Sequence, residues 1–308
     1  DGSLLSKSLL NQGFEVIGLT RNSSTNLDNL KNLKIEKDIN LEEGEISDFG
    51  LIKKLIESNN PVEIYNLAAQ SSVGKSFTSP KETFESIVGA TINILEVSKN
   101  INYKGRLFFA GSSEIFGNTN KKADLKHRQD PHSPYGIAKQ ASLNLVKMYR
   151  EQNNLSCVTG ILFNHESPLR QEYYVTQKII SEAILCSKNI NHKVNIGNID
   201  IARDWGWAEE YVEGMQLIAR ANNLKDQILC TGRLTSLKQF IEITFQKLNL
   251  RWEEHINIDE SLFRSKDIKI SVGNPIQMEK ELKWKARVGI ELLIEKLIEN
   301  KIKVTELT

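Results

Sequence analysis

Two segments decide the fold of this chain. The first is Arg106-Leu-Phe-Phe-Ala-Gly111, and the second runs from Ser133 to Leu162 and reads SPYGIAKQASLNLVKMYREQNNLSCVTGIL. The first segment is a short apolar run typical of a buried strand. The second begins with a helical pattern from Ser133 to Asn153 and ends with a strand from Cys157 to Leu162. A strand, a helix and another strand at this spacing predict a right-handed crossover between parallel strands.

The same alternation extends toward the N-terminus, where we expect helices and strands in turn. The predicted elements are a helix at Gly2–Gln12, a strand at Phe14–Thr20, a helix at Leu51–Ser58, a strand at Val62–Ala68 and a helix at Phe84–Asn100. After Asn164 the pattern is less regular, with helices expected near 175–187, 208–221, 236–248 and 290–300. This order predicts an α/β fold, a Rossmann-type doubly wound parallel sheet with a smaller C-terminal substrate-binding lobe. We expect residues 1–163 to form the dinucleotide-binding domain. Residues 164–308 would mainly form the lobe, with some segments returning to the first domain.

Composition excludes several classes of protein. Lys and Arg number 40 against 39 acidic residues, so no charge excess indicates a nucleic-acid or membrane partner. The cysteines, Cys157, Cys186 and Cys230, are odd in number and far apart, which argues against a disulfide framework and fits a reducing cytoplasm. The histidines do not have the spacing of a zincin site, and we expect no metal. No apolar run reaches membrane-spanning length, and no signal pattern is present.

The beginning of the chain departs from the usual order of a doubly wound sheet. Such folds open with an apolar strand that leads into Gly-x-x-Gly-x-x-Gly, where a pyrophosphate meets a helix N-terminus. Here Asp1-Gly2 directly precedes the first helix. We therefore expect that the sequence lacks its natural start and that Gly2 is the last glycine of that loop. The alternative is a naturally frayed N-terminus.

The end of the strand Phe14–Thr20 bears on the choice of cofactor. In this fold an acidic residue there suits the ribose 2′-hydroxyl of NAD, whereas cationic and hydroxyl groups suit the 2′-phosphate of NADP. The chain offers Arg21, Asn22, Ser23 and Ser24, with no acid until Asp28. This favours NADP, and the alternative is an ordinary polar loop.

A Tyr-x-x-x-Lys pair marks the start of the helix at Ser133. Tyr135 and Lys139 lie one turn apart on one helix face, where the ammonium is expected to lower the phenol's pKa so that it can act as a general base. Tyr174 and Lys178 have the same spacing, so the pattern alone is weak. Tyr135 is favoured because a strand that ends in Ser112 precedes it and could place a second hydroxyl beside the phenol. Tyr174 has no such strand upstream.

Glu114 separates two kinds of chemistry. A dehydratase needs a base, because oxidation of a sugar at C4 makes the C5 hydrogen acidic, and the same carboxyl can protonate the departing C6 hydroxyl. A plain reductase or epimerase needs no such group. The alternative is a solvated carboxylate at a strand end, and some related reductases also carry Ser-Glu here.

Longer strings of residues carry a family resemblance. They are Gly160-Ile-Leu-Phe-Asn-His-Glu-Ser-Pro168, Val175-Thr-Gln-Lys178, Ile196-Gly-Asn-Ile-Asp200, Arg203-Asp-Trp-Gly206, Tyr65-Asn-Leu-Ala-Ala-Gln-Ser71 and Ser133-Pro-Tyr-Gly136. With these strings the chain resembles the extended short-chain dehydrogenase/reductase superfamily and, within it, the GDP-mannose 4,6-dehydratase family. The resemblance covers essentially the whole chain.

The resemblance implies a role for each matching residue. The implied catalytic residues are Ser112, Glu114, Tyr135 and Lys139. The implied NADP contacts are Asp1, Gly2, Arg21, Asn22, Ser23, Ser24, Glu45, Ile46, Leu67, Ala68, Ala69, Gln70, Ser71, Lys139, His165 and Arg170. The implied contacts to the nucleotide diphosphate are Asn164, Lys178, Arg203 and Arg264.

The chain departs from the family pattern at four positions and in two segments. Ser112 stands where the family has Thr, Glu45 where it has Asp, and Asn22 and Leu169 where it has Arg. The chain is also shorter than typical members between Asn26 and Leu41 and around Trp252 to Asp259. We expect a cytoplasmic homodimer or homotetramer that dehydrates GDP-mannose with bound NADP. Two alternatives stay open: a related nucleotide-sugar reductase or epimerase, and a catalytically impaired homologue that still binds a sugar nucleotide.

Overall fold

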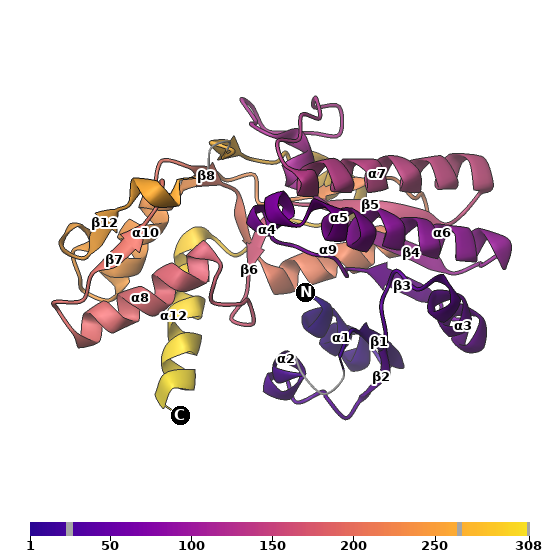
Figure 1. The fold of residues 1–308 in the computed structure, drawn as a ribbon, viewed down its shortest axis with the longest axis horizontal. Helices are drawn as coiled ribbons and strands as arrows, with labels where there is room; N and C mark the ends of the chain where they lie inside the picture. The colour runs from indigo at the N-terminus through magenta and orange to yellow at the C-terminus, as the bar shows by residue number, and fades with distance from the viewer. Residues whose placement is uncertain (23–26, 264–266, 307–308) are drawn as a thin grey trace.

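A four-stranded parallel sheet forms the centre of the larger lobe (Figure 1). The computed structural model describes residues 1–22, 27–263 and 267–306. The strands lie side by side in the order β10 (Gln227–Leu229), β5 (Cys157–Leu162), β4 (Arg106–Ser112) and β3 (Glu63–Asn66). A separate parallel pair joins β1 (Val16–Thr20) to β2 (Ile39–Glu43).

Helices cover both faces of the four-stranded sheet because successive side chains of a strand point to opposite sides. Leu107 and Phe109 of β4 pack in one apolar cluster with α3 (Phe49–Asn59), α6 (Ala90–Asn100) and α7 (Pro134–Asn153). Phe108, between them in sequence, packs in another cluster with α9 (Ala208–Arg220) and α11 (Ile276–Leu282). The sheet is therefore doubly wound, and the predicted fold class is confirmed.

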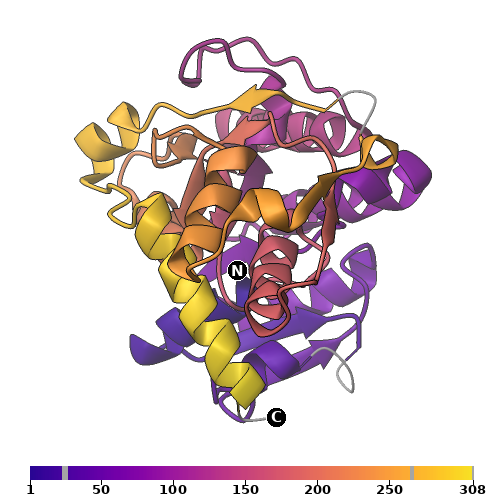
Figure 2. The ribbon, with the colours of Figure 1, turned by 90° about the vertical axis from the view of Figure 1, so that its left-hand side faces the viewer.

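The smaller lobe has its own apolar core. Three helices pack together there: α8 (Val175–Lys188), α10 (Leu237–Lys247) and α12 (Ile290–Glu306). They lie with the parallel pair β7 (Val194–Ile196) and β12 (Ile256–Ile258). In Figure 2 this lobe faces the viewer, with α12 in yellow running beside α10. Each helix thus buries a hydrophobic stripe inside the lobe rather than against the central sheet.

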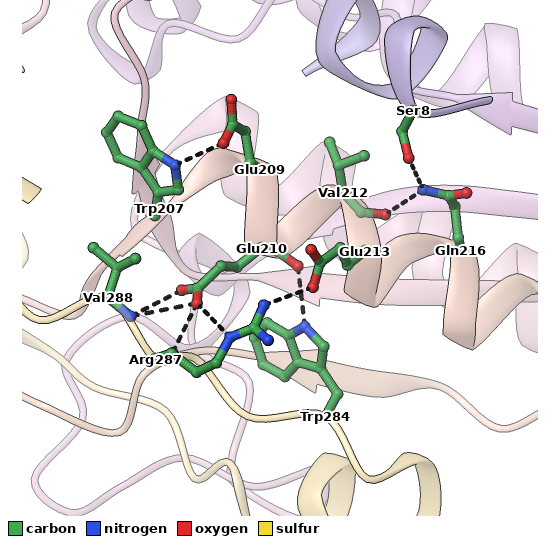
Figure 3. Close-up of polar contacts among 10 residues, drawn as sticks. All are labelled: Ser8, Trp207, Glu209, Glu210, Val212, Glu213, Gln216, Trp284, Arg287 and Val288. Carbon is green, nitrogen blue, oxygen red and sulfur yellow. Dashed lines mark hydrogen bonds and ion pairs between the residues drawn. The ribbon is translucent and has the colours of Figure 1, made fainter. Parts of the chain in front are cut away.

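Helix α9 connects distant parts of the chain through polar contacts (Figure 3). The buried carboxylate of Glu210 accepts hydrogen bonds from the backbone N–H groups of Arg287 and Val288, at 2.9 and 3.2 Å. Gln216, two turns later, donates to Ser8 Oγ of α1 (Gly2–Asn11) at 2.9 Å. One helix therefore fixes both the first helix and the segment before α12 onto the same face of the sheet.

The strong helical and apolar patterns predicted the long elements to within a few residues, and the short elements were missed. The predicted helix at Phe84–Asn100 is interrupted, because α5 (Pro80–Phe84) and α6 are joined by a π-helical turn at Glu85–Gly89. The chain stays helical through that turn, so the spacing of hydrophobic residues in the sequence gave no sign of the π-helical turn. The elements without a sequence prediction include α2 (Asp28–Asn32), β2, α4 (Val73–Thr78), most of α5, α11, and the short strands β6 (Asn164–Glu166), β7, β8 (Ala202–Arg203), β9 (Trp205–Trp207), β10, β11 (Thr235–Ser236), β12 and β13 (Ile270–Ser271). Within the described ranges no helix is both long and apolar enough to cross a membrane.

Candidate active site

A cavity of about 920 Å³ opens where the strands of the central sheet end and the smaller lobe begins. Segments that follow β3, β4 and β5 line it, because the carboxyl ends of parallel strands meet at one edge of the sheet. Residues 110–114 with Tyr135 and Lys139 form one side, the sheet wall. A second part of the lining, the lobe wall, comes from residues between Asn164 and Thr176.

The end of β4 and the start of α7 position the residues of the sheet wall. Strand β4 ends at Ser112, whose Oγ accepts a hydrogen bond from Glu114 N at 3.3 Å and so caps the short turn that follows. Helix α7 starts with Pro134 in its first turn, and the Ser133 hydroxyl accepts from Gly136 N at 3.0 Å. This cap places Tyr135 in the first turn, where its side chain faces the strand end.

The phenol of Tyr135 is protonated at neutral pH in this structure. Burial is the largest effect and raises its pKa to about 12. A hydrogen bond with Ser112 lowers the pKa in part, and the nearby Glu114 carboxylate raises it further. Lys139 Nζ lies 5.7 Å from the centroid of the Tyr135 ring and donates to Ala110 O at 2.7 Å. Burial also lowers the pKa of Lys139 to about 8. The net pKa of the phenol is raised in this structure mainly by loss of hydration, and the lowering expected from Lys139 stays a prediction.

Glu114 and Tyr135 border the same cavity. The carboxylate is close enough to raise the phenol's pKa, as two groups that both ionise to negative charge do. An acid–base pair on one side of a nucleotide-sized cavity is an arrangement that can move two protons on one bound molecule. The two groups thus meet one condition of the dehydration hypothesis, which is that they border the same cavity.

The lobe wall holds charged groups in buried surroundings. Glu166 is only 2% exposed, its Oε2 lies 3.3 Å from Arg170 Nε, and burial raises its pKa. His165 Nδ1 donates to Phe163 O at 2.8 Å, since a carbonyl can only accept. Burial lowers the pKa of His165 to about 4, whereas the contact of its Nε2 with the Asp1 carboxylate favours the protonated ring. Its Nε2 lies 2.9 Å from Asp1 Oδ2.

The start of α1 has the features of a phosphate-binding position. Asp1 and Ser3 line the cavity, and the Asp1 side chain makes no capping hydrogen bond to the first turn of the helix. A Cβ added at Gly2 would meet nothing within 4 Å, so a ligand can approach the backbone there. The first N–H groups of a helix attract anions through their hydrogens and the helix dipole. These residues fit the pyrophosphate of a dinucleotide.

The structure brings many of the predicted site residues to the cavity. The residues that line it are Asp1, Leu67, Ala69, Ser71, Ser112, Glu114, Tyr135, Lys139, Asn164, His165, Arg170 and Arg203. Arg203 is buried, and its guanidinium lies 3.1 Å from Asp267 Oδ1. Ser23, Ser24 and Arg264 lie outside the described residues.

Other predicted residues do not line the cavity as the structure describes it. These are Gly2, Arg21, Asn22, Glu45, Ile46, Ala68, Gln70 and Lys178. The Gln70 amide donates to Ser72 O and Thr83 Oγ1, both at 3.0 Å, so its side chain shapes the loop itself. Lys178 Nζ donates to Asn195 O at 2.8 Å. Among the described residues no three His, Cys, Asp or Glu side chains gather where they could hold a metal ion.

Asn29 and Tyr174 are two of the lining residues that sequence reasoning missed. Asn29 of α2 borders the cavity and donates to Leu169 O at 3.3 Å, and nothing in its sequence context signals this. Tyr174 also borders it, and its hydroxyl lies 3.0 Å from Ser71 Oγ. The second Tyr-x-x-x-Lys pair was a usable signal for Tyr174, although its partner lysine points elsewhere.

Comparison with known proteins gives a consistent family assignment. A family model described as GDP-mannose 4,6 dehydratase matches residues 1–297. The chain is 33% identical to GDP-mannose 4,6 dehydratase 1 of Arabidopsis thaliana over 317 residues, which covers 99% of this chain and 88% of that protein. It is 31% identical to GDP-mannose 4,6 dehydratase of Homo sapiens, covering 97% of this chain and 87% of the other.

Solved structures agree on the fold. A UDP-glucose 4-epimerase of Thermotoga maritima, determined with UDP-glucose, has a TM-score of 0.87 at 20% identity and covers 99% of this chain and 96% of its own. A dTDP-glucose 4,6-dehydratase of Bacillus anthracis in complex with NAD has a TM-score of 0.86 at 17% identity, covering 99% and 94%.

Proposed function

The chain belongs to the GDP-mannose 4,6-dehydratase family, and we propose that it converts GDP-α-D-mannose to GDP-4-keto-6-deoxy-D-mannose and water in the cavity described above. The observation that carries this proposal is the shared cavity of Tyr135 and Glu114, with the Ser112 hydroxyl bonded to the phenol. The reaction is redox-neutral overall. Water leaves from C5 and C6, and C4 ends as a ketone.

Tyr135 acts on the O4 hydroxyl of the hexose. Its phenolate oxygen removes the O4 proton as the C4 hydrogen leaves with its electron pair, and Ser112 holds that oxygen through a hydrogen bond. A pKa of about 12 means that positive charge near the phenol is needed before it can act as a base. Lys139 provides part of that charge from the next turn of α7.

Glu114 acts on C5 and C6 of the same ring. Once C4 is a ketone, the C5 hydrogen is acidic, and the carboxylate removes it as a proton. The same carboxyl then protonates the C6 hydroxyl, which leaves as water. The saturated product forms when C6 receives hydride and C5 receives a proton.

The cofactor of this proposal is NADP, which the start of α1 and the loop of Leu67, Ala69 and Ser71 would hold. When bound it supplies the acceptor for the C4 hydride and the donor for C6. The support for NADP over NAD is the loop after β1, where Arg21 and Asn22 come before any acidic residue. Arg21 is exposed and available to a 2′-phosphate.

The substrate's diphosphate is met by Arg203 and Asn164. Arg203 borders the cavity, and Asp267 holds its guanidinium at this wall, where a fixed cation suits phosphate oxygens. Asn164 begins β6 on the lobe wall. Lys178 would have to leave Asn195 O to reach a phosphate.

We also propose that the chain works as a homo-oligomer. Phe84, Ile92 and Ile137 lie on the neighbouring helices α5, α6 and α7, and each is 38–45% exposed. A second copy of the chain would cover them. Light scattering should then give a mass well above the 35.0 kDa of one chain.

The Glu114→Gln variant tests the dehydration step. Purified protein is incubated with GDP-mannose, and the 4-keto-6-deoxy product is followed by mass spectrometry together with NADPH absorbance. The unaltered chain should form product with no net change in NADPH. In the variant kcat should fall by about 10²–10⁴-fold, because general acid–base groups contribute effects of that size, with nucleotide affinity nearly unchanged.

A matched control is Glu57→Gln, the same chemical change on the outer face of α3. Unchanged turnover of Glu114→Gln would remove the case for dehydration. Net consumption of NADPH by the unaltered chain would indicate a reductase. Bound nucleotide without turnover would indicate an impaired homologue.

A further inference from the structure

A second phenol borders the cavity, and it joins the two lobes. Tyr174 is the N-cap residue of α8 in the smaller lobe, whereas Ser71 lies in the loop after β3 of the larger lobe. The Tyr174 hydroxyl lies 3.0 Å from Ser71 Oγ, and both residues line the cavity. A hydrogen bond between segments 103 positions apart therefore crosses from one lobe to the other beside the site.

The Tyr174 ring is held in place from the lobe wall. The guanidinium carbon of Arg170 lies 3.8 Å from the centroid of that ring. Arg170 is itself fixed, because its Nη1 donates to His165 O at 3.1 Å and its Nε pairs with the buried Glu166. A flat cation stacked on the ring limits its rotation. The Tyr174 hydroxyl also shares a hydrogen bond with the neighbouring Tyr173.

The contacts argue against a catalytic role for this second Tyr-x-x-x-Lys pair. Lys178, one turn after Tyr174, donates to Asn195 O at 2.8 Å instead of facing the phenol. The hydroxyl of Tyr174 meets Ser71 on a loop, whereas that of Tyr135 meets Ser112 at the end of a central strand. The two phenols therefore make different hydrogen bonds, although Tyr174 is close enough to Tyr135 to help raise the pKa of that phenol.

We propose that Tyr174 is a positioning residue whose hydroxyl, through Ser71, sets the loop of residues 67–71 for binding of the dinucleotide cofactor. The inference rests on the proposed function, in which that loop lies along NADP. It places the effect of Tyr174 on cofactor affinity and not on the chemical step. Retention of the cofactor matters in this reaction because each cycle returns it to its starting state.

The test compares Tyr174→Phe, Ser71→Ala and the double variant in the full-length chain. Tyr174→Phe keeps the ring for Arg170 and removes only the hydroxyl. Each single change should weaken NADP⁺ binding, measured by isothermal titration, by about 2- to 10-fold, which is the usual effect of one hydrogen bond. The double variant should bind no more weakly than the weaker single variant, because both changes break the same bond.

A ligand-free measurement separates this inference from the proposed function. Amide hydrogen exchange of residues 67–72, followed by mass spectrometry without nucleotide, should become faster in Tyr174→Phe and in Ser71→Ala. The control is Tyr103→Phe, which removes a phenol hydroxyl that donates to Pro61 O at 2.7 Å and does not border the cavity. It should leave both the exchange of this loop and NADP⁺ affinity unchanged.

The outcomes are distinct. Unchanged loop exchange in Tyr174→Phe overturns the inference whether or not NADP⁺ binds. Strictly multiplicative losses in the double variant, or a loss of kcat at saturating nucleotide, also overturn it. If loop exchange becomes faster in the variants but the protein binds no NADP⁺, the role of Tyr174 in positioning the loop is supported. The proposal that NADP is the cofactor is then contradicted.

Discussion

The two sides of the cavity are held by different forces. The sheet wall continues directly from β4, where Leu107, Phe108 and Phe109 are at most 3% exposed and pack against helices on both faces. The lobe wall leaves the sheet after β5 and combines polar contacts, such as Glu166 with Arg170, with stacking of His165 on Tyr211 of α9.

This difference indicates how the protein separates chemistry from binding. Close packing of strand and helix gives Ser112 and Tyr135 a rigid base, which proton transfer over about 3 Å requires.

The largest effect should come from the sheet wall itself. Tyr135→Phe removes the phenol oxygen and keeps the ring, so kcat should fall by about 10³-fold while nucleotide affinity changes little. Steady-state kinetics and titration calorimetry on the same preparation measure both quantities. A fall in affinity as large as the fall in kcat would show that Tyr135 mainly binds.

The apolar support of the same wall should matter for stability. Phe108 is fully buried, so Phe108→Ala should lower the free energy of unfolding by about 4 kcal/mol, as loss of a buried aromatic ring commonly does. Urea denaturation measures this, with Phe49→Ala at a 42% exposed position as the control. Equal losses in the two variants would contradict the central place of β4 in the core.

The lobe wall should show the smaller and pH-dependent effect. His165 has an ordinary pKa of 6.5, and burial lowers it to about 4 in the folded protein. Its stabilising contribution is therefore present above pH 6.5 and is lost as pH falls toward 4, because the unfolded state binds the proton more tightly. Between pH 7 and pH 5 this amounts to about 2 kcal/mol of unfolding free energy.

The comparison of the native chain with His165→Asn isolates that contribution. Asn can still donate to Phe163 O but does not titrate. Urea unfolding at the two pH values should show a smaller loss of stability in the variant. If both proteins lose the same amount, groups other than His165 control the pH response of the lobe wall.

Prediction from sequence worked where the pattern was long and local. The strand at Cys157–Leu162 was predicted at its observed bounds, and α7 differs from its prediction by one residue at Ser133. Both have an apolar period sustained over several residues and clear boundary residues. Strands of two or three residues, such as β6 and β8, are too short to show a period. They form because other segments pair with them, β9 with β6 and β11 with β8.

The candidate site divides in the same way. Ser112, Glu114 and Tyr135 follow recognisable element ends, so their meeting could be predicted from the order of strands and helices. The contact of Tyr174 with Ser71 could not be predicted, because it depends on how the smaller lobe sits against the larger one. The raised pKa of Tyr135 was likewise missed, since burial is not visible in a spacing of four residues.

The sequence by itself determined the alternating elements of this protein, its doubly wound sheet and the strand and helix ends that carry its reactive groups. These follow from local periodicity and from the chirality of connections, which act over short stretches of chain. Only the tertiary structure decided which distant groups share the cavity, which cations are already paired, and how desolvation shifts their pKa values. Those properties depend on distances between segments and on exclusion of water, and neither exists before the chain has packed.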